Sequence, residues 1–261
     1  MVKKQDVFRM LEQLEIRHND KIVVHSSLRA IGPIENGAEG LIEAFCEYLS
    51  DGMLLIPTHT WAGIIERRTY DPRKTVPCIG TLPTVAAFHP KGIRSLHPTH
   101  SLAVFGKDAA EYVSREKTYS TPGAADNCLS RLLEEKGRIL LIGVGFECNT
   151  YIHCVEERLD IPNRIDTQEI PVTVTGYDDC TFVVPFHGHA VKGLDVGIST
   201  YYPNLEKPLA YLGAVTYATL GRAKVTCCDA VKTYEAIGML WSKADYDLCF
   251  GEREVPEAYY K

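Results

Sequence analysis

The sequence of 261 residues predicts an α/β protein with a central, mostly parallel or mixed sheet, flanked by helices and followed by a β-rich C-terminal part. Two observations predict this class. Unbroken apolar runs at 21–27, 52–58 and 137–145 are typical of strands that are buried on both faces. Helical periodicity separates these runs, whereas regular alternation of apolar and polar residues appears late, at 170–186.

The first half of the chain predicts alternating helices and strands. A helix at 4–16 gathers its apolar residues on one face, namely Val7, Met10, Leu11 and Leu14. The strand at 21–27, a helix at 37–50 and the strand at 52–58 then form a β-α-β unit. Further helices are expected near 80–88, 107–115 and 126–136, before the strand at 137–145.

Beyond Pro162 the pattern becomes richer in strands. The segment 170–186 alternates on either side of the turn residues 176–179, which predicts a β-hairpin. A helix near 202–212, a strand at 222–230 and a helix at 229–243 complete the chain. With no internal repeat and no linker in the sequence, we expect a single domain over 1–261, with a β-rich insertion at approximately 163–200.

Composition and charge exclude several classes of function. Hydrophobic residues make up 45% and charged residues 24%, which is ordinary for a soluble globular protein. The formal charge of −6, without a lysine or arginine run, argues against nucleic acid as a partner. No apolar run of about 18 residues and no signal-peptide pattern occurs, so we expect no membrane association. Nine cysteines without metal-type pairs fit a reduced, cytoplasmic protein.

Two serines end the strand at 21–27 and precede a Gly-Pro turn. Ser26 and Ser27 supply hydroxyl groups, and the following helix start supplies free N–H groups, at an edge where α/β sheets bind ligands. An ordinary turn with a serine cap explains the same residues. The pattern alone therefore leaves both interpretations open.

Two histidine pairs raise the question of a metal. His97 and His100 flank Pro98, so the segment 94–106 is expected to be an extended loop, and these rings either line a polar pocket or form structural hydrogen bonds. His187 and His189 share one face of a strand, but no third ligand is identifiable by spacing. Both patterns disfavour a metal site.

The segment 149–157, NTYIHCVEE, predicts a helix start that carries an acid–base pair. Asn149 and Thr150 are good N-cap residues, and Glu156 follows His153 at i+3 on the same face. A carboxylate at this spacing can orient an imidazole as a general base. A buried histidine that is satisfied by a backbone carbonyl, with glutamates favouring the helix N-terminus, is the competing interpretation.

Several motifs in order resemble one known family. They are HSSLRAIG, IPTHTW, YDPRKTVPCIGTLP, IRSLHPTHSLAVFG and TPGAADNCLSRLLEEKGRILLIGVGFECNTYIHCVEE, which lie within residues 25–157. Together they resemble the aminoglycoside N3-acetyltransferase, or antibiotic N-acetyltransferase, family, clearly over about residues 5–160 and loosely beyond. The resemblance implies an α/β fold that transfers acetyl from acetyl-coenzyme A to a small-molecule amine without a metal, and a homodimer as the candidate assembly.

The resemblance also implies roles for individual residues. His153 is expected to be the catalytic base, with Glu156 as its carboxylate partner. Cofactor-binding positions are expected at Ser26, Ser27, Leu28, Arg94, Ser95 and Ser101, and substrate-binding positions at Thr60, Asp71 and His97. A neutral imidazole with a pKa near 6.5 suits the task of taking the proton that an attacking amine must lose.

The resemblance weakens where an acceptor would be selected. Family members commonly show a Phe-Gly-Pro stretch where this chain has TPGAADN at 121–127, and the tract after Pro162 does not align. The acidic candidates for an aminoglycoside site are Asp71, Asp166, Asp178, Asp179 and Asp195, although acidic loops are often simply solvated. Two alternatives remain: a metal-dependent hydrolase using His97, His100, His187 and His189, and a non-catalytic protein that binds coenzyme A or another ligand.

Overall fold

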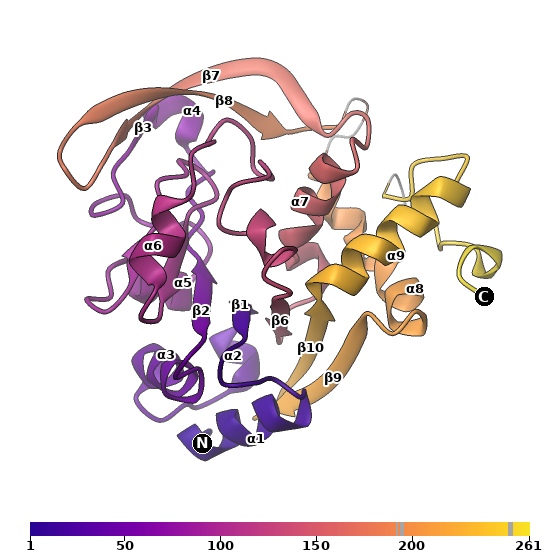
Figure 1. Ribbon diagram of the computed structural model, residues 1–261, viewed down its shortest axis with the longest axis horizontal. Helices are drawn as coiled ribbons and strands as arrows, with labels where there is room; N and C mark the ends of the chain where they lie inside the picture. The colour runs from indigo at the N-terminus through magenta and orange to yellow at the C-terminus, as the bar shows by residue number, and fades with distance from the viewer. Residues whose placement is uncertain (192, 194–195, 250–252) are drawn as a thin grey trace.

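The computed structural model describes residues 1–191, 193, 196–249 and 253–261. Its strands are β1 (Lys21–Ser26), β2 (Met53–Pro57), β3 (Thr69–Tyr70), β4 (Ile93–Arg94), β5 (Leu102–Phe105), β6 (Arg138–Ile142), β7 (Ile165–Thr175), β8 (Thr181–His189), β9 (Val215–Leu220) and β10 (Ala223–Asp229). Seven of them form one sheet in the order β4-β5-β2-β1-β6-β10-β9 (Figure 1).

The sheet is parallel only at its centre. Strand β1 runs parallel to β2 and to β6, with Val23 opposite Leu55 on one side and Ile139 on the other. All outer strands of this sheet, β4, β5, β9 and β10, pair in antiparallel fashion. The predicted central mixed sheet is therefore confirmed, and its parallel strands are the three that the apolar runs identified.

Helices cover both faces of the sheet, which explains why the central strands are apolar without interruption. Val23 of β1 faces the cluster that includes residues of α6 (Ala109–Ser114), α7 (Tyr151–Arg158) and α9 (Ala230–Lys243). Ile22 and Val24 face the cluster of α1 (Lys4–Gln13), α3 (Gly37–Tyr48) and α5 (Thr81–Ala87). Among the described residues, no helix is both long and apolar enough to cross a membrane. The helices are α1 (Lys4–Gln13), α2 (Leu28–Ile31), α3 (Gly37–Tyr48), α4 (Ile64–Arg67), α5 (Thr81–Ala87), α6 (Ala109–Ser114), α7 (Tyr151–Arg158), α8 (Glu206–Tyr211) and α9 (Ala230–Lys243), with 3₁₀ turns η1 (Ser130–Leu132), η2 (Phe146–Cys148), η3 (Ile198–Leu205) and η4 (Glu257–Tyr259).

The predicted hairpin is present and forms a second sheet. Strands β7 and β8 pair in antiparallel fashion and β3 adds to β7, giving the order β3-β7-β8. In Figure 1 this hairpin arches over one end of the molecule, above the ends of β1 and β2. A separate apolar cluster that includes Ile64, Tyr70 and Phe186 joins the hairpin to α4 and β3.

Several segments differ from the sequence prediction. The helix expected near 202–212 is the 3₁₀ helix η3 up to Leu205 and becomes α-helical, as α8, only from Glu206. Residues 126–136 form turns and the short helix η1 instead of an α-helix, because Asn127 donates to the carbonyl of Pro122 and accepts from the N–H of Ser130. Strand β9 was not predicted at all. It is an edge strand in which buried and exposed residues alternate imperfectly, so its periodicity is weak.

Candidate functional site

A cavity of about 810 Å³ lies where the carboxyl ends of β1 and β2 meet the hairpin. Its walls include residues from the ends of both strands, from α4 and α5, from η2 and α7, and from β7, β8 and η3. Ligands of open α/β sheets bind at this edge, because parallel strands end together there and the connecting loops leave space. The cavity is therefore the candidate active site.

Five histidines line the cavity, although they come from separate segments: His25, His59, His100, His153 and His189. The His153 ring lies 3.9 Å from the His189 ring and 6.2 Å from the His100 ring, measured between centroids. Burial lowers the pKa values of His25 and His153 to about 4, and those of His59 and His100 well below the usual value. At neutral pH these four rings are uncharged.

The connection from β6 to α7 places His153 in the cavity wall. The chain leaves β6 through Gly143, which has a φ of 67°, and turns through η2 before α7 begins at Tyr151. Thr150 is the N-cap residue, but its side chain makes no capping hydrogen bond; its hydroxyl lies 3.4 Å from Nε2 of His25. The predicted helix start is confirmed. Thr150, however, lines the cavity and does not cap the helix with its hydroxyl.

Behind His153 lies a buried chain of polar groups. The Tyr202 hydroxyl is 2.5 Å from Nδ1 of His153 and 2.6 Å from Oε2 of Glu156. Arg164 donates from Nε to Oε1 of Glu156 at 2.5 Å, and Asp247 accepts two hydrogen bonds of 2.8 Å from the same guanidinium group. Burial alone would raise the pKa of Glu156, but interactions with His153, Arg164 and Tyr202 outweigh it and lower that pKa.

The described lining of the cavity carries negatively charged side chains. Glu66, Glu147 and Asp166 line it, and no lysine or arginine is among its described lining residues. Trp61 and Ile65, which are 52% and 58% exposed, add apolar surface at the same wall. Such a lining favours a cationic ligand with some apolar surface over an anion.

One group of ligand-type atoms, in the cavity wall and directly behind it, has the composition of a metal site. Single ligand atoms of His153, Glu156 and His189 lie within 4.8 Å of one another. However, both oxygens of Glu156 already accept hydrogen bonds from Arg164 and Tyr202. A metal would have to displace these partners from a buried carboxylate, so the residues present fit a metal poorly.

Comparison with known proteins places this architecture in a family. A sequence model of the family described as aminoglycoside 3-N-acetyltransferase matches residues 23–240. The chain belongs to this aminoglycoside 3-N-acetyltransferase family. The family expected from the ordered motifs is therefore confirmed.

Individual relatives have low sequence identity to this chain. Aminoglycoside N(3)-acetyltransferase IX of Micromonospora chalcea is 29% identical, over 64% of this chain and 66% of its own length. Aminoglycoside N(3)-acetyltransferase IV of Salmonella sp is 30% identical, over 61% and 60%. The matches thus span less than two thirds of either relative. The solved structure of AAC-IIIb in a binary complex with CoASH is 21% identical, with a TM-score of 0.76 over 92% of this chain and 96% of that chain, and it shows the shared fold.

In this family member, the predicted serine pair divides into two roles. Ser26 lines the cavity, and its buried Oγ has no hydrogen-bond partner among the described residues. Ser27 instead caps α2, because its Oγ accepts from the N–H of Ala30 at 3.3 Å. Leu28 is partly buried against the hydrophobic cluster that includes α1, α3 and α5. Of these three residues, Ser26 alone offers the cavity a free polar group.

Four further residues that were predicted to bind the cofactor or the substrate do not line the cavity. They form a buried network beside it. The guanidinium group of Arg94 donates to the hydroxyls of Thr58 and Ser101 and to three backbone carbonyl oxygens. Ser95 accepts from the N–H of Leu102, and Thr60 donates to the carbonyl of Pro98. Arg94, Ser95, Ser101 and Thr60 therefore act in this structure by fixing the loops around the cavity.

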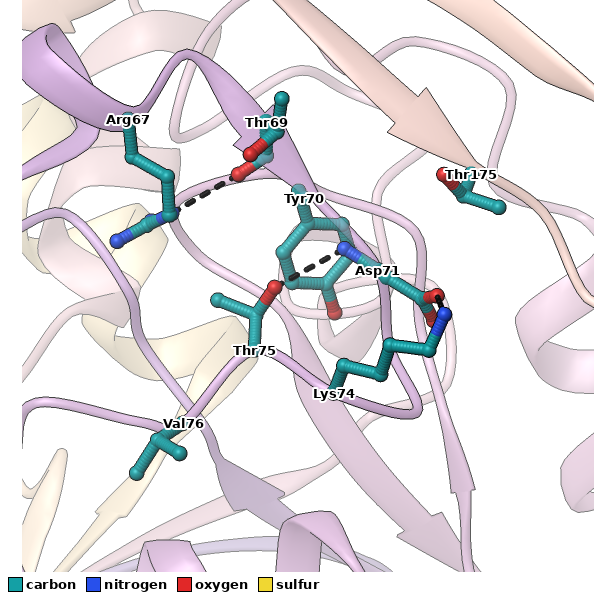
Figure 2. Close-up of a pocket in the computed structure, with 8 residues that line it drawn as sticks. All are labelled: Arg67, Thr69, Tyr70, Asp71, Lys74, Thr75, Val76 and Thr175. Carbon is teal, nitrogen blue, oxygen red and sulfur yellow. Dashed lines mark hydrogen bonds and ion pairs between the residues drawn. The ribbon is translucent and has the colours of Figure 1, made fainter.

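The two remaining predicted substrate residues also lie outside the cavity. Asp71 lines a smaller hollow, where its N–H donates to Thr75 and its carboxylate is 3.3 Å from the ammonium group of Lys74 (Figure 2). His97 is fully buried, with Nε2 bonded to the carbonyl of Thr121 and Nδ1 accepting from the N–H groups of Thr99 and His100. Both of its nitrogens are therefore occupied.

The acidic candidates and the second histidine pair are also separated by the fold. Asp166 lines the cavity, Asp179 pairs with Arg73 and Asp178 holds the hairpin turn through the N–H of Cys180, while Asp195 lies outside the described residues. His189 lines the cavity, whereas Nδ1 of His187 bonds to the carbonyl of Asp166. The four histidines of the hydrolase alternative are thus not assembled as one ligand set.

Several residues that line the cavity, and Tyr202 behind its wall, were missed by the sequence reasoning. His25 and His59 lie at the ends of β1 and β2, so the rule that ligands bind beyond strand ends was a usable signal for both. Tyr202 belongs to η3 and lies 46 residues after Glu156, and nothing in the local pattern pointed to it. Glu66 lies in the one-turn helix α4 and Glu147 in the 3₁₀ turn η2, and the spacing of these two acids along the chain carries no signal.

Proposed function

We propose that this protein transfers an acetyl group from acetyl-CoA to an amine of an aminoglycoside or of a related small-molecule amine, with His153 as general base. One observation carries the proposal: a neutral imidazole lies in the wall of a large cavity, with Nδ1 held from behind by Tyr202. Membership of the aminoglycoside 3-N-acetyltransferase family supports this assignment.

The chemistry requires a base at this place. The amine nitrogen attacks the thioester carbonyl carbon, so that a C–N bond forms while the C–S bond breaks. His153 takes the proton that the nitrogen loses, and the imidazolium then returns that proton to the departing CoA thiolate, so that the ring is neutral again. Because its pKa is lowered to about 4, the ring is neutral at pH 7 and its lone pair is available for this transfer, but it is a weaker base than the imidazole with a pKa near 6.5 that the sequence suggested.

The thioester substrate needs donors near its carbonyl oxygen, because negative charge develops there. The free Oγ of Ser26 supports such a role, since it is buried beside the cavity without a partner among the described residues. Ser27 is less suited, because its N–H and Oγ are both used within the protein. The solved relative AAC-IIIb, which binds CoASH, supports coenzyme A as the carrier.

The acceptor side of the proposal depends on charge. Glu66, Glu147 and Asp166 favour a ligand that carries ammonium groups, and no described lysine or arginine of the lining opposes it. Release of free thiol from acetyl-CoA, measured with a panel of 2-deoxystreptamine aminoglycosides and simpler amines, tests the activity directly. Binding of CoA without product from any amine would favour the non-catalytic alternative.

The base is tested by comparing His153→Ala with His187→Ala. We expect His153→Ala to lower kcat/KM by about 10²- to 10⁴-fold, because general-base catalysis is lost. His187 lies on β8 of the hairpin, outside the cavity lining, and its replacement should leave the rate unchanged. A His153→Ala enzyme with the wild-type rate at saturating amine would contradict the assignment.

A metal-dependent hydrolase is the second candidate, favoured by the grouping of His153, Glu156 and His189. Its discriminating property is metal content. Stoichiometric zinc in protein purified without added metal, together with loss of activity on chelation, would support the metal-dependent hydrolase and contradict the proposed acetyl transfer. We expect activity with acetyl-CoA to be unaffected by a chelator, because Glu156 is held by Arg164 and Tyr202.

A further inference from the structure

Tyr202 stands between the two residues that the sequence pairs as base and carboxylate. Its hydroxyl oxygen is 2.5 Å from Nδ1 of His153 and 2.6 Å from Oε2 of Glu156. The direct separation of Nδ1 and Oε2 is 3.7 Å, which is too long for a hydrogen bond. The hydrogen-bonded connection between the imidazole and the carboxylate therefore passes through the tyrosine hydroxyl.

The proton positions in this chain follow from the donors available. Arg164 donates to Oε1 of Glu156 and keeps the carboxylate ionised, so Glu156 can only accept. Tyr202 has a single hydroxyl proton, which this arrangement directs to Oε2. The tyrosine oxygen is then an acceptor for Nδ1–H of His153, and the lone pair of the neutral ring is on Nε2.

We propose that Tyr202 is a positioning residue, which fixes the Nδ1–H tautomer of His153 and connects the ring to the Glu156 carboxylate. The proposal rests on the function of His153 as base. When Nε2 accepts the amine proton, the imidazolium donates from Nδ1 to a hydroxyl that itself donates to an anion. A chain of hydrogen bonds of this kind stabilises the positive charge without moving the proton off Nδ1.

The tyrosine is held firmly enough for this role. Its side chain is fully buried, and burial raises the pKa of its hydroxyl well above the usual value, so the proton is retained. Glu156 and Arg164 have side chains that are each 1% exposed. Asp247 binds the far side of the guanidinium group at two positions, which fixes the end of the chain.

Other charged or titratable groups around the His153 ring come from several elements. His189 of β8 lies against it with a tilted ring, His59 and His100 approach from the loops after β2 and β4, and Glu157 follows on α7. Glu157 accepts hydrogen bonds from Thr121, from the N–H of Gly123 and from His189. Among the described groups around the ring, Glu156 is therefore the anion that Tyr202 links to Nδ1 of His153.

The first experiment reads the tautomer directly and needs no substrate. Long-range ¹H–¹⁵N correlation spectra of protein with ¹⁵N-labelled histidine distinguish a protonated from an unprotonated ring nitrogen. In the wild type we expect His153 to carry its proton on Nδ1. In Tyr202→Phe we expect the proton to be shared with Nε2 or to move there. A wild-type ring protonated on Nε2, or an unchanged tautomer in the variant, would overturn the proposal.

The second experiment measures catalysis in Tyr202→Phe against Tyr201→Phe. Tyr201 is the neighbouring, partly buried tyrosine, and no contact places it at His153. We expect Tyr202→Phe to lower kcat about tenfold or more, with the KM for acetyl-CoA changed by less than about twofold. The acid limb of kcat/KM should move to lower pH, because the imidazolium loses its link to Glu156.

A packing role for the tyrosine would give different results. Phenylalanine preserves the ring, so a purely structural tyrosine would leave the pH profile and the tautomer unchanged. A fluorinated tyrosine in place of Tyr202 keeps the hydroxyl and should restore the rate if the proposal is correct. If wild-type protein transfers acetyl to no amine, the proposed function fails, while the tautomer spectrum still decides the role of Tyr202.

Discussion

Two serines that the family motifs place near the cofactor differ in what their hydroxyl groups contact. Ser101 is fully buried and exchanges hydrogen bonds with Thr58 and Arg94. Ser26 lines the cavity with a buried hydroxyl that has no partner among the described residues. A buried polar atom without a partner costs free energy. A bound substrate would therefore supply the hydrogen-bond partner that the Ser26 hydroxyl lacks.

Alanine substitutions should separate these two roles. We expect Ser101→Ala to lower the free energy of unfolding by about 1 kcal/mol, because the buried network loses hydrogen bonds. Ser26→Ala should not lower the free energy of unfolding, because its hydroxyl has no partner to lose, but it should lower kcat/KM with acetyl-CoA. Urea denaturation and thiol-release kinetics on both variants provide the comparison. Equal losses of stability in the two variants would show that the Ser26 hydroxyl is satisfied within the protein.

At the scale of elements, the connection between β6 and α7 determines where His153 points. Gly143 follows the last residue of β6 with a φ of 67°, in the left-handed region that favours glycine. A Cβ atom at this position would lie 2.5 Å from Cβ of Ala30, the third residue of α2. The turn therefore requires glycine for two independent reasons, the backbone conformation and the close approach of α2.

Gly143→Ala and Gly213→Ala form a matched pair that separates these reasons. Gly213 has a φ of 72°, but a Cβ there meets nothing within 4 Å. We expect Gly213→Ala to cost about 1 kcal/mol of unfolding free energy from backbone strain alone. Gly143→Ala should cost clearly more, because α2 must also shift. Thermal melts of both variants measure this, and an equal change in Tm would rule out the steric contribution.

At the scale of the whole molecule, the fold gathers uncharged imidazoles around one cavity. Burial lowers the pKa values of His25, His97 and His153 to about 4, and those of His59 and His100 further below the ordinary value. In the unfolded chain each ring binds a proton near pH 6.5. Protonation therefore favours the unfolded chain, and the cavity is a source of acid sensitivity.

The sign of the resulting pH dependence is fixed. Between about pH 6.5 and pH 4 the unfolded chain binds more protons than the folded one, so stability falls as the pH falls through this window. Each such ring contributes a slope of up to about 1.4 kcal/mol per pH unit. We expect the urea midpoint to be stable above pH 7 and to drop steeply toward pH 5. A midpoint that is constant or rises over this range would contradict the buried neutral rings.

The helices and the central strands were predictable because they depend on local periodicity. The apolar runs identified β1, β2 and β6, and the alternation around Gly176 identified the hairpin. Prediction failed at residues 126–136, where side-chain hydrogen bonds of Asn127 replace helical ones, and at β9, an edge strand with a weak pattern. In both cases contacts outside the local period decided the structure.

The sequence by itself determined the family, the parallel centre of the sheet and the position of His153 near a helix start, because motifs and periodicity are local properties. Only the tertiary structure decided which polar groups meet. It separated Ser26 from Ser27, used Arg94 to fix loops, and placed Tyr202 between His153 and Glu156. The physical reason is that hydrogen bonds between distant residues depend on how packed elements approach each other. No spacing along the chain records that approach.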